Sequence, residues 1–180
     1  MSAPLPLDSV PALARLNAIL DAAPESTGDE IGLFMAKDLR PSGYDQTPLN
    51  ARPFAWTGGD GVHFCLLDAG AGLSETCPVV MTAPMAFPTP NLVLGRDLGE
   101  FLSLGIVEGF FALDGLIYSP QETIGRLDAT PARDRHPVLA EIARSFGLTP
   151  VTDAAAHLAA CARDAEPLIV PAPEDPDAHS

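Results

Sequence analysis

The stretch PFAWTGGDGVHFCLL, from Pro53 to Leu67, places two short apolar runs on either side of Gly58-Gly59-Asp60-Gly61. Glycine reaches positive φ without steric cost, and aspartate tolerates it better than most residues. A four-residue link of this kind between two apolar runs is typical of a tight β-hairpin. We therefore expect strands over residues 54–57 and 62–67, with at least one of the linking glycines at positive φ.

The second arm of this hairpin is apolar on both of its faces. Val62, Phe64 and Leu66 share one side of the expected strand, while Cys65 and Leu67 lie on the other. A strand that is apolar on both sides usually lies inside a sheet with other elements packed on each face. The hairpin is therefore expected to be central to the fold.

Further elements are expected along the chain. β-branched residues predict strands at Cys77–Thr82 and Asn91–Gly95. Apolar residues at helical spacing, bounded by capping residues, glycine or proline, predict the helices. The expected helices cover about residues 9–23, 31–39, 97–105, 107–117, 135–146 and 152–163. A strand is the alternative for 31–39, and residues 118–130 are expected to form a polar connection.

These elements predict an α+β chain with one hydrophobic core. We expect residues 1–118 to form the sheet-bearing domain, 119–166 to form a helical C-terminal extension packed on it, and 167–180 to be a disordered tail. Most of the following residues are expected in one buried cluster: Phe54, Trp56, Val62, Phe64, Val80, Leu92, Leu94, Phe101 and Leu102.

The net charge of −14 restricts the classes of partner. Phosphate contacts need clustered Lys and Arg, so direct binding of nucleic acid is disfavoured. Anionic membrane surfaces are disfavoured for the same reason. The charge fits a basic protein partner, although a surface that only keeps the chain soluble is the commoner explanation of such a charge.

The chain has few residues that could hold a metal: Cys65, Cys77, Cys161, His63, His136, His157 and His179. They are dispersed, and no CxxC pair occurs, so we expect neither a structural metal nor a cofactor. The cysteine count and the absence of a secretory signal at the N-terminus favour the reducing cytoplasm.

The hairpin contains two residues, Asp60 and His63, whose side chains could take part in acid/base catalysis. Asp60 and His63 are three positions apart and could form an acid/base pair beside a cleft. The more ordinary explanation is a turn aspartate and a hydrogen-bonded strand histidine. The glycine-rich link does not fit a phosphate loop, because a strand rather than a helix follows it and no Lys or Arg occurs between Arg52 and Arg96.

The same window, free of basic residues, carries Asp60, Asp68 and Glu75 at expected turns. Together these three acids could form a patch that binds a basic partner. Alternatively, they are solvated loop residues.

Three segments carry a family resemblance: TPLNARPFAWTGGDGVHFCLL, PVVMTAPMAF and NLVLGRDLGEFLSLGIVEGFFAL, together roughly residues 47–116. Their order, and the D-L-x-x-F-L pattern at Asp97–Leu102, resemble the SUKH superfamily, the SMI1/KNR4-like group of bacterial proteins. The resemblance implies an α+β fold with one mixed, largely antiparallel sheet flanked by helices. It also implies a protein-binding role, since many members look like immunity proteins that neutralise nuclease toxins, and it supplies no catalytic residues.

The first hypothesis for function is accordingly a non-enzymatic cytoplasmic protein that binds a partner, such as a basic nuclease-type toxin, through Asp60, Asp68 and Glu75. The alternatives are a small-molecule-binding or enzymatic domain that uses Asp60 and His63 in a cleft beside Gly58–Gly61, and a regulatory scaffold module.

Overall fold

The computed structural model describes residues 4–129 and 135–172 of the chain. Its centre is a five-stranded sheet in the order β2-β4-β5-β6-β7, and every neighbouring pair is antiparallel. The strands are β2 (Phe34–Met35), β4 (Ala51–Trp56), β5 (His63–Leu67), β6 (Val79–Thr82) and β7 (Asn91–Gly95). A separate two-stranded sheet pairs β1 (Leu5–Pro6) with β3 (Asp38–Leu39). The fold is α+β, as the sequence predicted.

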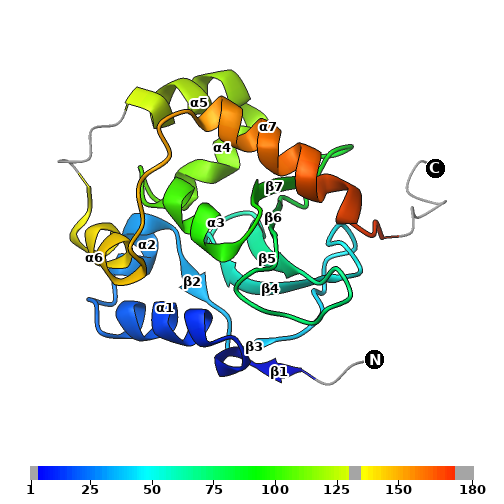
Figure 1. Ribbon diagram of the computed structural model, residues 1–180, viewed down its shortest axis with the longest axis horizontal. Coiled ribbons are helices and arrows are strands. Elements are labelled where there is room, and N and C mark those ends of the chain that lie inside the picture. Colours follow the sequence, from blue (N-terminus) through cyan, green and yellow to red (C-terminus); the bar gives the residue numbers. More distant parts are fainter. Residues whose placement is uncertain (1–3, 130–134, 173–180) are drawn as a thin grey trace.

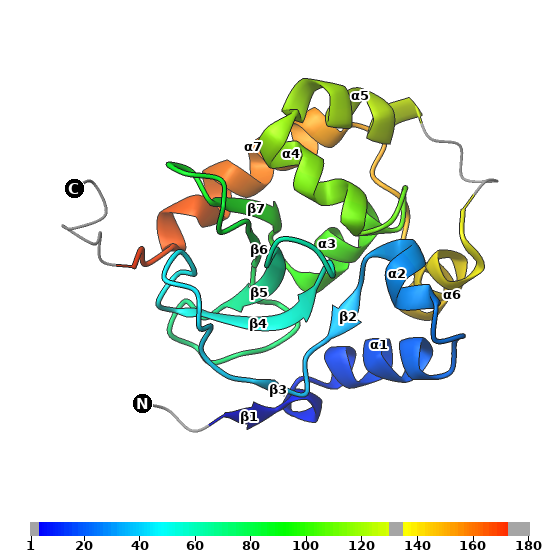
Figure 2. The ribbon, with the colours of Figure 1, turned by 180° about the vertical axis from the view of Figure 1, so that it is seen from behind.

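Helices surround this sheet (Figures 1 and 2). The described α-helices are α1 (Pro11–Asp21), α2 (Thr27–Ile31), α3 (Leu98–Gly105), α4 (Gly115–Tyr118), α5 (Pro120–Ala129), α6 (Pro137–Phe146) and α7 (Ala154–Ala165). Short 3-10 helices lie at Leu7–Ser9, Phe111–Asp114 and Glu166–Leu168. In both views α6 lies beside α1 and α2, and α7 runs along β7.

The glycine link forms the predicted hairpin turn between β4 and β5. Gly58 and Gly61 have φ of 93° and 70°, and Asp60 between them has φ of 48°. The Thr57 amide donates to the Val62 carbonyl at 3.1 Å, which closes the loop. The left-handed conformations explain why the link is built from glycine and aspartate.

Both faces of the sheet are covered. On one face Phe54, Phe64 and Leu94 belong to the main hydrophobic cluster, which α1 and α3 complete. On the other face lies a second, smaller cluster made of Ala51, Cys65, Leu67, Val80, Val93, Cys161 and Ala165. The last two residues belong to α7, so this helix covers the second face.

The expected core is mostly correct. Of the predicted members, Phe54, Val62, Phe64, Leu94, Phe101 and Leu102 lie in the main cluster, and Leu92 is partly buried against it. Val80 lies in the second cluster instead, because its side chain points to the opposite face of the sheet. Trp56 is only half-buried, since it ends β4 beside the short edge strand β2.

Two expected helices are wrong in part. The helix expected over residues 31–39 does not form: Gly32, at φ 67°, ends α2, and the chain continues into β2 and β3, in agreement with the strand alternative. The helix expected over 107–117 is interrupted at Gly109, at φ 107°, after which Phe110 donates its amide to the Ile31 carbonyl. This contact outside the helix replaces the bond that would have continued it.

Most of the polar connection expected over residues 118–130 is instead helix α5, Pro120–Ala129, and residue 130 lies outside the described residues. Pro120 occupies its first turn, where proline is tolerated, and Thr123 and Leu127 are buried at helical spacing. Only two of its ten residues are buried, which is why the apolar pattern was too sparse to indicate a helix.

The C-terminal helices share the main core with the sheet. Leu127, Leu139 and Ile142 belong to the same cluster as Phe64. The beginning of the expected disordered tail is held in place, because the Val170 amide donates to Asn50 Oδ1 at 3.0 Å and the Leu49 amide donates to the Val170 carbonyl at 2.9 Å. The rest of that expectation, residues 173–180, lies outside the described residues.

Phe64 offers a test of this core. Its side chain is fully buried, against the rings of Phe101 and Phe110. Phe64→Ala is expected to lower the free energy of unfolding by about 3–5 kcal/mol, through lost transfer energy and the cavity left behind. Tyr118→Ala, at an exposed aromatic, is the matched control and should change it by no more than about 0.5 kcal/mol. Urea denaturation measures both, and a Phe64→Ala loss below about 1 kcal/mol would contradict a tightly packed site.

Candidate functional site

Three segments meet at one end of the sheet. The register pairs Trp56 with His63, His63 with Thr82 and Thr82 with Asn91. The β4–β5 turn and the loop from β6 to β7 (residues 83–90) therefore leave the sheet at the same end. Asn91 also donates its side-chain amide to the Gln46 carbonyl at 3.0 Å, which brings the segment before β4 to this end. We call this region the turn end of the sheet.

Aromatic rings lie directly on the glycines of the turn. A Cβ added to Gly58 would lie 2.7 Å from Cε2 of Phe34, and one added to Gly61 would lie 2.6 Å from the hydroxyl of Tyr44. A Cβ added to Gly59 would lie 3.5 Å from Cε2 of Phe111, which is an ordinary van der Waals contact. All three rings are partly exposed, with 37% to 53% of each residue accessible. Glycine is therefore needed here to let aromatic side chains close over the backbone.

The β6–β7 loop adds the two most exposed large apolar residues in the described part of the chain. Met85 is 77% and Phe87 is 76% exposed. Pro84, Pro88 and Pro90 restrict the backbone on both sides of them. A stiff loop that presents apolar side chains loses little conformational entropy when those side chains are buried in a complex.

Acidic groups accompany these apolar side chains. Asp60 is exposed at the tip of the turn, and Asp45 is exposed next to Tyr44. Burial raises the pKa of Asp114, and the negative charge of nearby Asp60 raises this pKa further. Arg126, which forms an ion pair with Glu108 at 2.6 Å, partly offsets the effect.

The three acids expected to form one patch are not brought together. Asp60 precedes β5, whereas Asp68 follows it, and the five residues between the strand ends extend for about 16 Å. Asp68 Oδ1 accepts hydrogen bonds from the amides of Gly70 and Gly72, so its role is to hold a turn. Glu75 is exposed in the connection that follows, at the same end as Asp68.

His63 is a buried strand residue. Its Nδ1 lies 2.7 Å from the Gly61 carbonyl, which can only accept, so Nδ1 carries the proton. Its Nε2 then accepts from the Thr47 hydroxyl at 2.9 Å. Tyr44 stacks on the ring, with centroids 5.5 Å apart. Burial lowers the pKa of His63, and the Gly61 hydrogen bond opposes that change.

The geometry does not join Asp60 and His63 into an acid/base pair. Both ring nitrogens of His63 are occupied by Gly61 and Thr47, and the exposed Asp60 has no hydrogen bond to the ring among the described contacts. Two surface hollows, of about 570 and 290 Å³, lie along α1 and β2. Neither is lined by the Gly58–Gly61 turn, so neither supports the cleft that the enzymatic hypothesis requires.

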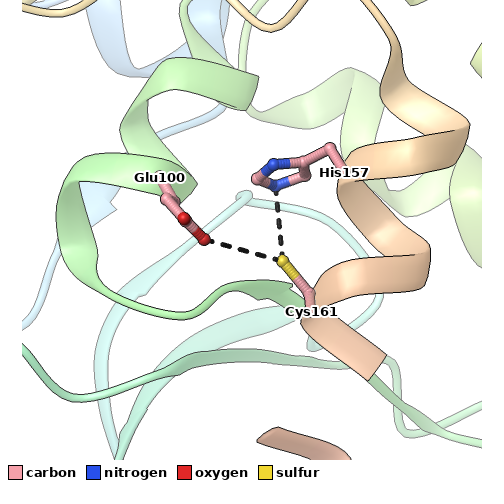
Figure 3. A group of neighbouring side chains, drawn as sticks. All are labelled: Glu100, His157 and Cys161. Carbon is pink, nitrogen blue, oxygen red and sulfur yellow. Dashed lines mark hydrogen bonds between the residues drawn. The ribbon is translucent and has the colours of Figure 1, made fainter. Parts of the chain in front are cut away.

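A second group of side chains that could bind a metal or react lies where α7 runs along the edge strand β7: Glu100, His157 and Cys161 (Figure 3). His157 and Cys161 are one helical turn apart on α7, and their Nε2 and Sγ atoms are 3.5 Å apart. Glu100 comes from α3, and Cys161 donates its thiol to Glu100 Oε2 at 3.8 Å. His157 Nε2 also lies 2.7 Å from the Leu94 carbonyl on β7 and donates to it.

The surroundings of this cluster make the thiol a poor nucleophile. Burial and the charge of Glu100 raise the pKa of Cys161 to about 12. Arg96 binds Glu100 through its guanidinium and its main-chain amide, and these bonds lower the pKa of Glu100. Asp164 in turn pairs with Arg96 at 3.1 Å. The thiolate needed for nucleophilic catalysis is thus disfavoured at neutral pH.

The sequence did not indicate this cluster, because its cysteines and histidines are dispersed and lack the usual spacing of metal ligands along the chain. The i, i+4 spacing of His157 and Cys161 on a predicted helix was the available signal, because residues four apart lie on one helical face. Glu100 could not be assigned to the same cluster from the sequence, because only the tertiary structure brings α3 next to α7.

Comparisons of this chain with protein-family models, with curated proteins and with solved structures found no match. Across the described residues, none of the helices has the length and apolar character needed to cross a bilayer.

The buried histidine gives a prediction about pH. Because the pKa of His63 is lowered in the folded state, the unfolded chain binds more protons between the folded value and about 6.5. The contribution of His63 to stability is therefore fully present above about pH 6.5 and is lost as the pH falls below it. His63→Gln should lose less stability than the wild type between about pH 6.5 and 5, as measured by urea denaturation.

Titration of the carboxylates does not affect the comparison between the wild type and His63→Gln. Those with lowered pKa values, such as Glu30 and Glu100, start from an ordinary value of 4.5 and titrate below the window. They are also present in both proteins and cancel in the difference. Parallel stability curves for the wild type and His63→Gln would contradict a neutral, buried His63.

Proposed function

We propose that this chain is a non-enzymatic protein that binds a basic protein partner through the turn end of the sheet. The observation that carries the proposal is the concentration there of exposed apolar side chains: Phe34, Tyr44, Met85, Phe87 and Phe111. Aromatic residues and methionine are enriched at the centres of protein interfaces, so exposed side chains of these types at one end of the sheet favour a docking role.

The charge of this surface supports a basic partner. Asp45, Asp60 and Asp114 lie among or beside the apolar side chains, and no Lys or Arg occurs between Arg52 and Arg96. With a net charge of −14, the whole chain would attract a basic surface over a long distance. A membrane is a poorer candidate, because apolar loops that bind anionic bilayers are accompanied by basic residues.

The class of partner follows from the resemblance to the SUKH superfamily over residues 47–116. Immunity proteins of that superfamily neutralise nuclease toxins, whose active surfaces are basic because they hold phosphates. The proposal in its specific form is therefore a cytoplasmic immunity protein for a nuclease-type toxin. A neutral partner would favour the regulatory scaffold hypothesis instead.

The apolar loop can be tested with a matched pair of double variants. Met85→Ser with Phe87→Ser removes the two most exposed apolar side chains and should weaken the partner complex about tenfold or more, mainly through faster dissociation. Leu168→Ser with Val170→Ser removes exposed apolar side chains at the opposite end of the sheet and should leave binding unchanged.

The partner is first captured with the wild-type chain from a lysate of the native organism, identified and purified, and the two dissociation rates are then compared. Equal effects of the two double variants would show that the turn end has no special role.

The charge can be tested by single reversals at opposite ends of the sheet. Asp60→Lys should slow association with the partner, and its effect should shrink as salt rises. Glu75→Lys changes the net charge by the same amount, and Glu75 is exposed away from the turn end, so it should slow association much less. Stopped-flow association rates across salt concentrations measure both, and an equal effect of the two reversals would contradict a localised acidic surface.

A further inference from the structure

The cluster of Glu100, His157 and Cys161 has no role in the proposed partner surface, and its donor atoms are unusually close. One oxygen, one nitrogen and one sulfur, each from a different side chain, all lie within 4.8 Å of one another. The Leu94 carbonyl oxygen lies 2.7 Å from the same nitrogen. Three potential side-chain ligand atoms therefore meet between α3 and α7 (Figure 3).

The separations fit the ligands of a tetrahedral zinc ion. Zinc–sulfur and zinc–nitrogen bonds of about 2.3 and 2.0 Å place the two ligand atoms about 3.5 Å apart. The Cys161 Sγ to His157 Nε2 distance is 3.5 Å, and the Sγ to Glu100 Oε2 distance is 3.8 Å. To bind one ion, His157 Nε2 would exchange its 2.7 Å hydrogen bond to the Leu94 carbonyl for a bond to the metal, which requires the ring to turn away from that carbonyl.

The charges at the cluster also balance. A Cys161 thiolate and the Glu100 carboxylate would neutralise a divalent ion, while His157 binds as the neutral imidazole. Arg96 binds the Glu100 carboxylate, and Asp164 pairs with Arg96 at 3.1 Å. Arg96 would then orient the Glu100 carboxylate, as groups hydrogen-bonded to metal ligands commonly do.

The types of ligand select the kind of ion. A thiolate and an imidazole favour zinc over magnesium or calcium, which prefer oxygen ligands. On binding, the thiol proton leaves to solvent and the imidazole proton moves from Nε2 to Nδ1, so one proton is released for each ion bound.

We propose that Glu100, His157 and Cys161 form a zinc site that fastens α7 to α3, with water as the fourth ligand. This departs from the sequence-based expectation of no structural metal, which did not consider a carboxylate brought in from a second helix. The site is independent of the partner surface, so either proposal can fail without the other.

Cobalt(II) is the probe, because its bonds to thiolates absorb in the near ultraviolet and its visible bands report tetrahedral geometry. The full chain, stripped with a chelator and mixed with an equimolar amount of cobalt, should develop both sets of bands, and zinc should abolish them. Cys161→Ser should lose the near-ultraviolet thiolate band, and His157→Gln should weaken binding at least about tenfold. Circular dichroism verifies that each variant is folded.

Cys77→Ser is the control. Cys77 is buried, and its thiol donates to the Gly72 carbonyl away from the cluster. This variant should keep the cobalt bands. As a second measurement on the wild type, zinc at about a hundredfold excess over its dissociation constant should raise the melting temperature by about 5 °C or more, while magnesium should not. Absence of the cobalt bands in the wild type, their persistence in Cys161→Ser, or their loss in Cys77→Ser would overturn the proposal.

Discussion

The pairing of β4 with β5 through the Gly58–Gly61 turn is the constraint on which the rest of the structure depends. Because β5 carries apolar side chains on both faces, both faces must be buried in the folded chain. Two hydrophobic clusters, one on each face of the sheet, bury them. Phe64 faces the larger cluster with α1 and α3, while Cys65 faces the smaller one under α7. The helices are arranged around this sheet because each has one apolar side to bury.

The two edges of the sheet are protected from pairing with another chain in different ways. At the β7 edge, α7 runs along the strand, and His157 satisfies the Leu94 carbonyl that would otherwise be open to pairing with another chain. At the other edge, β2 contributes only two residues, and a short edge strand offers little template for such pairing. The covered edge is where the cluster of Glu100, His157 and Cys161 arises.

The candidate partner surface depends on the same hairpin. The antiparallel register brings the β4–β5 turn and the β6–β7 loop to one end, so apolar residues that are distant in sequence lie at the same end of the sheet. It also separates Asp60 from Asp68 by the length of β5. The three acids that the sequence grouped into one patch therefore lie at opposite ends of the sheet. Only Asp60 lies beside the exposed aromatic rings.

The sequence by itself determined the hairpin, the strands β6 and β7 and six residues of the main core, because turn chemistry and β-branched content act locally, although β6 begins at Val79 rather than at Cys77. It could not determine helix α5, whose apolar pattern is sparse, or the break at Gly109, which depends on the Ile31 carbonyl. Nor could it show that both nitrogens of His63 are occupied, or that Glu100 meets His157 and Cys161. Those outcomes require contacts between residues far apart in the chain, and only tertiary packing decides such contacts.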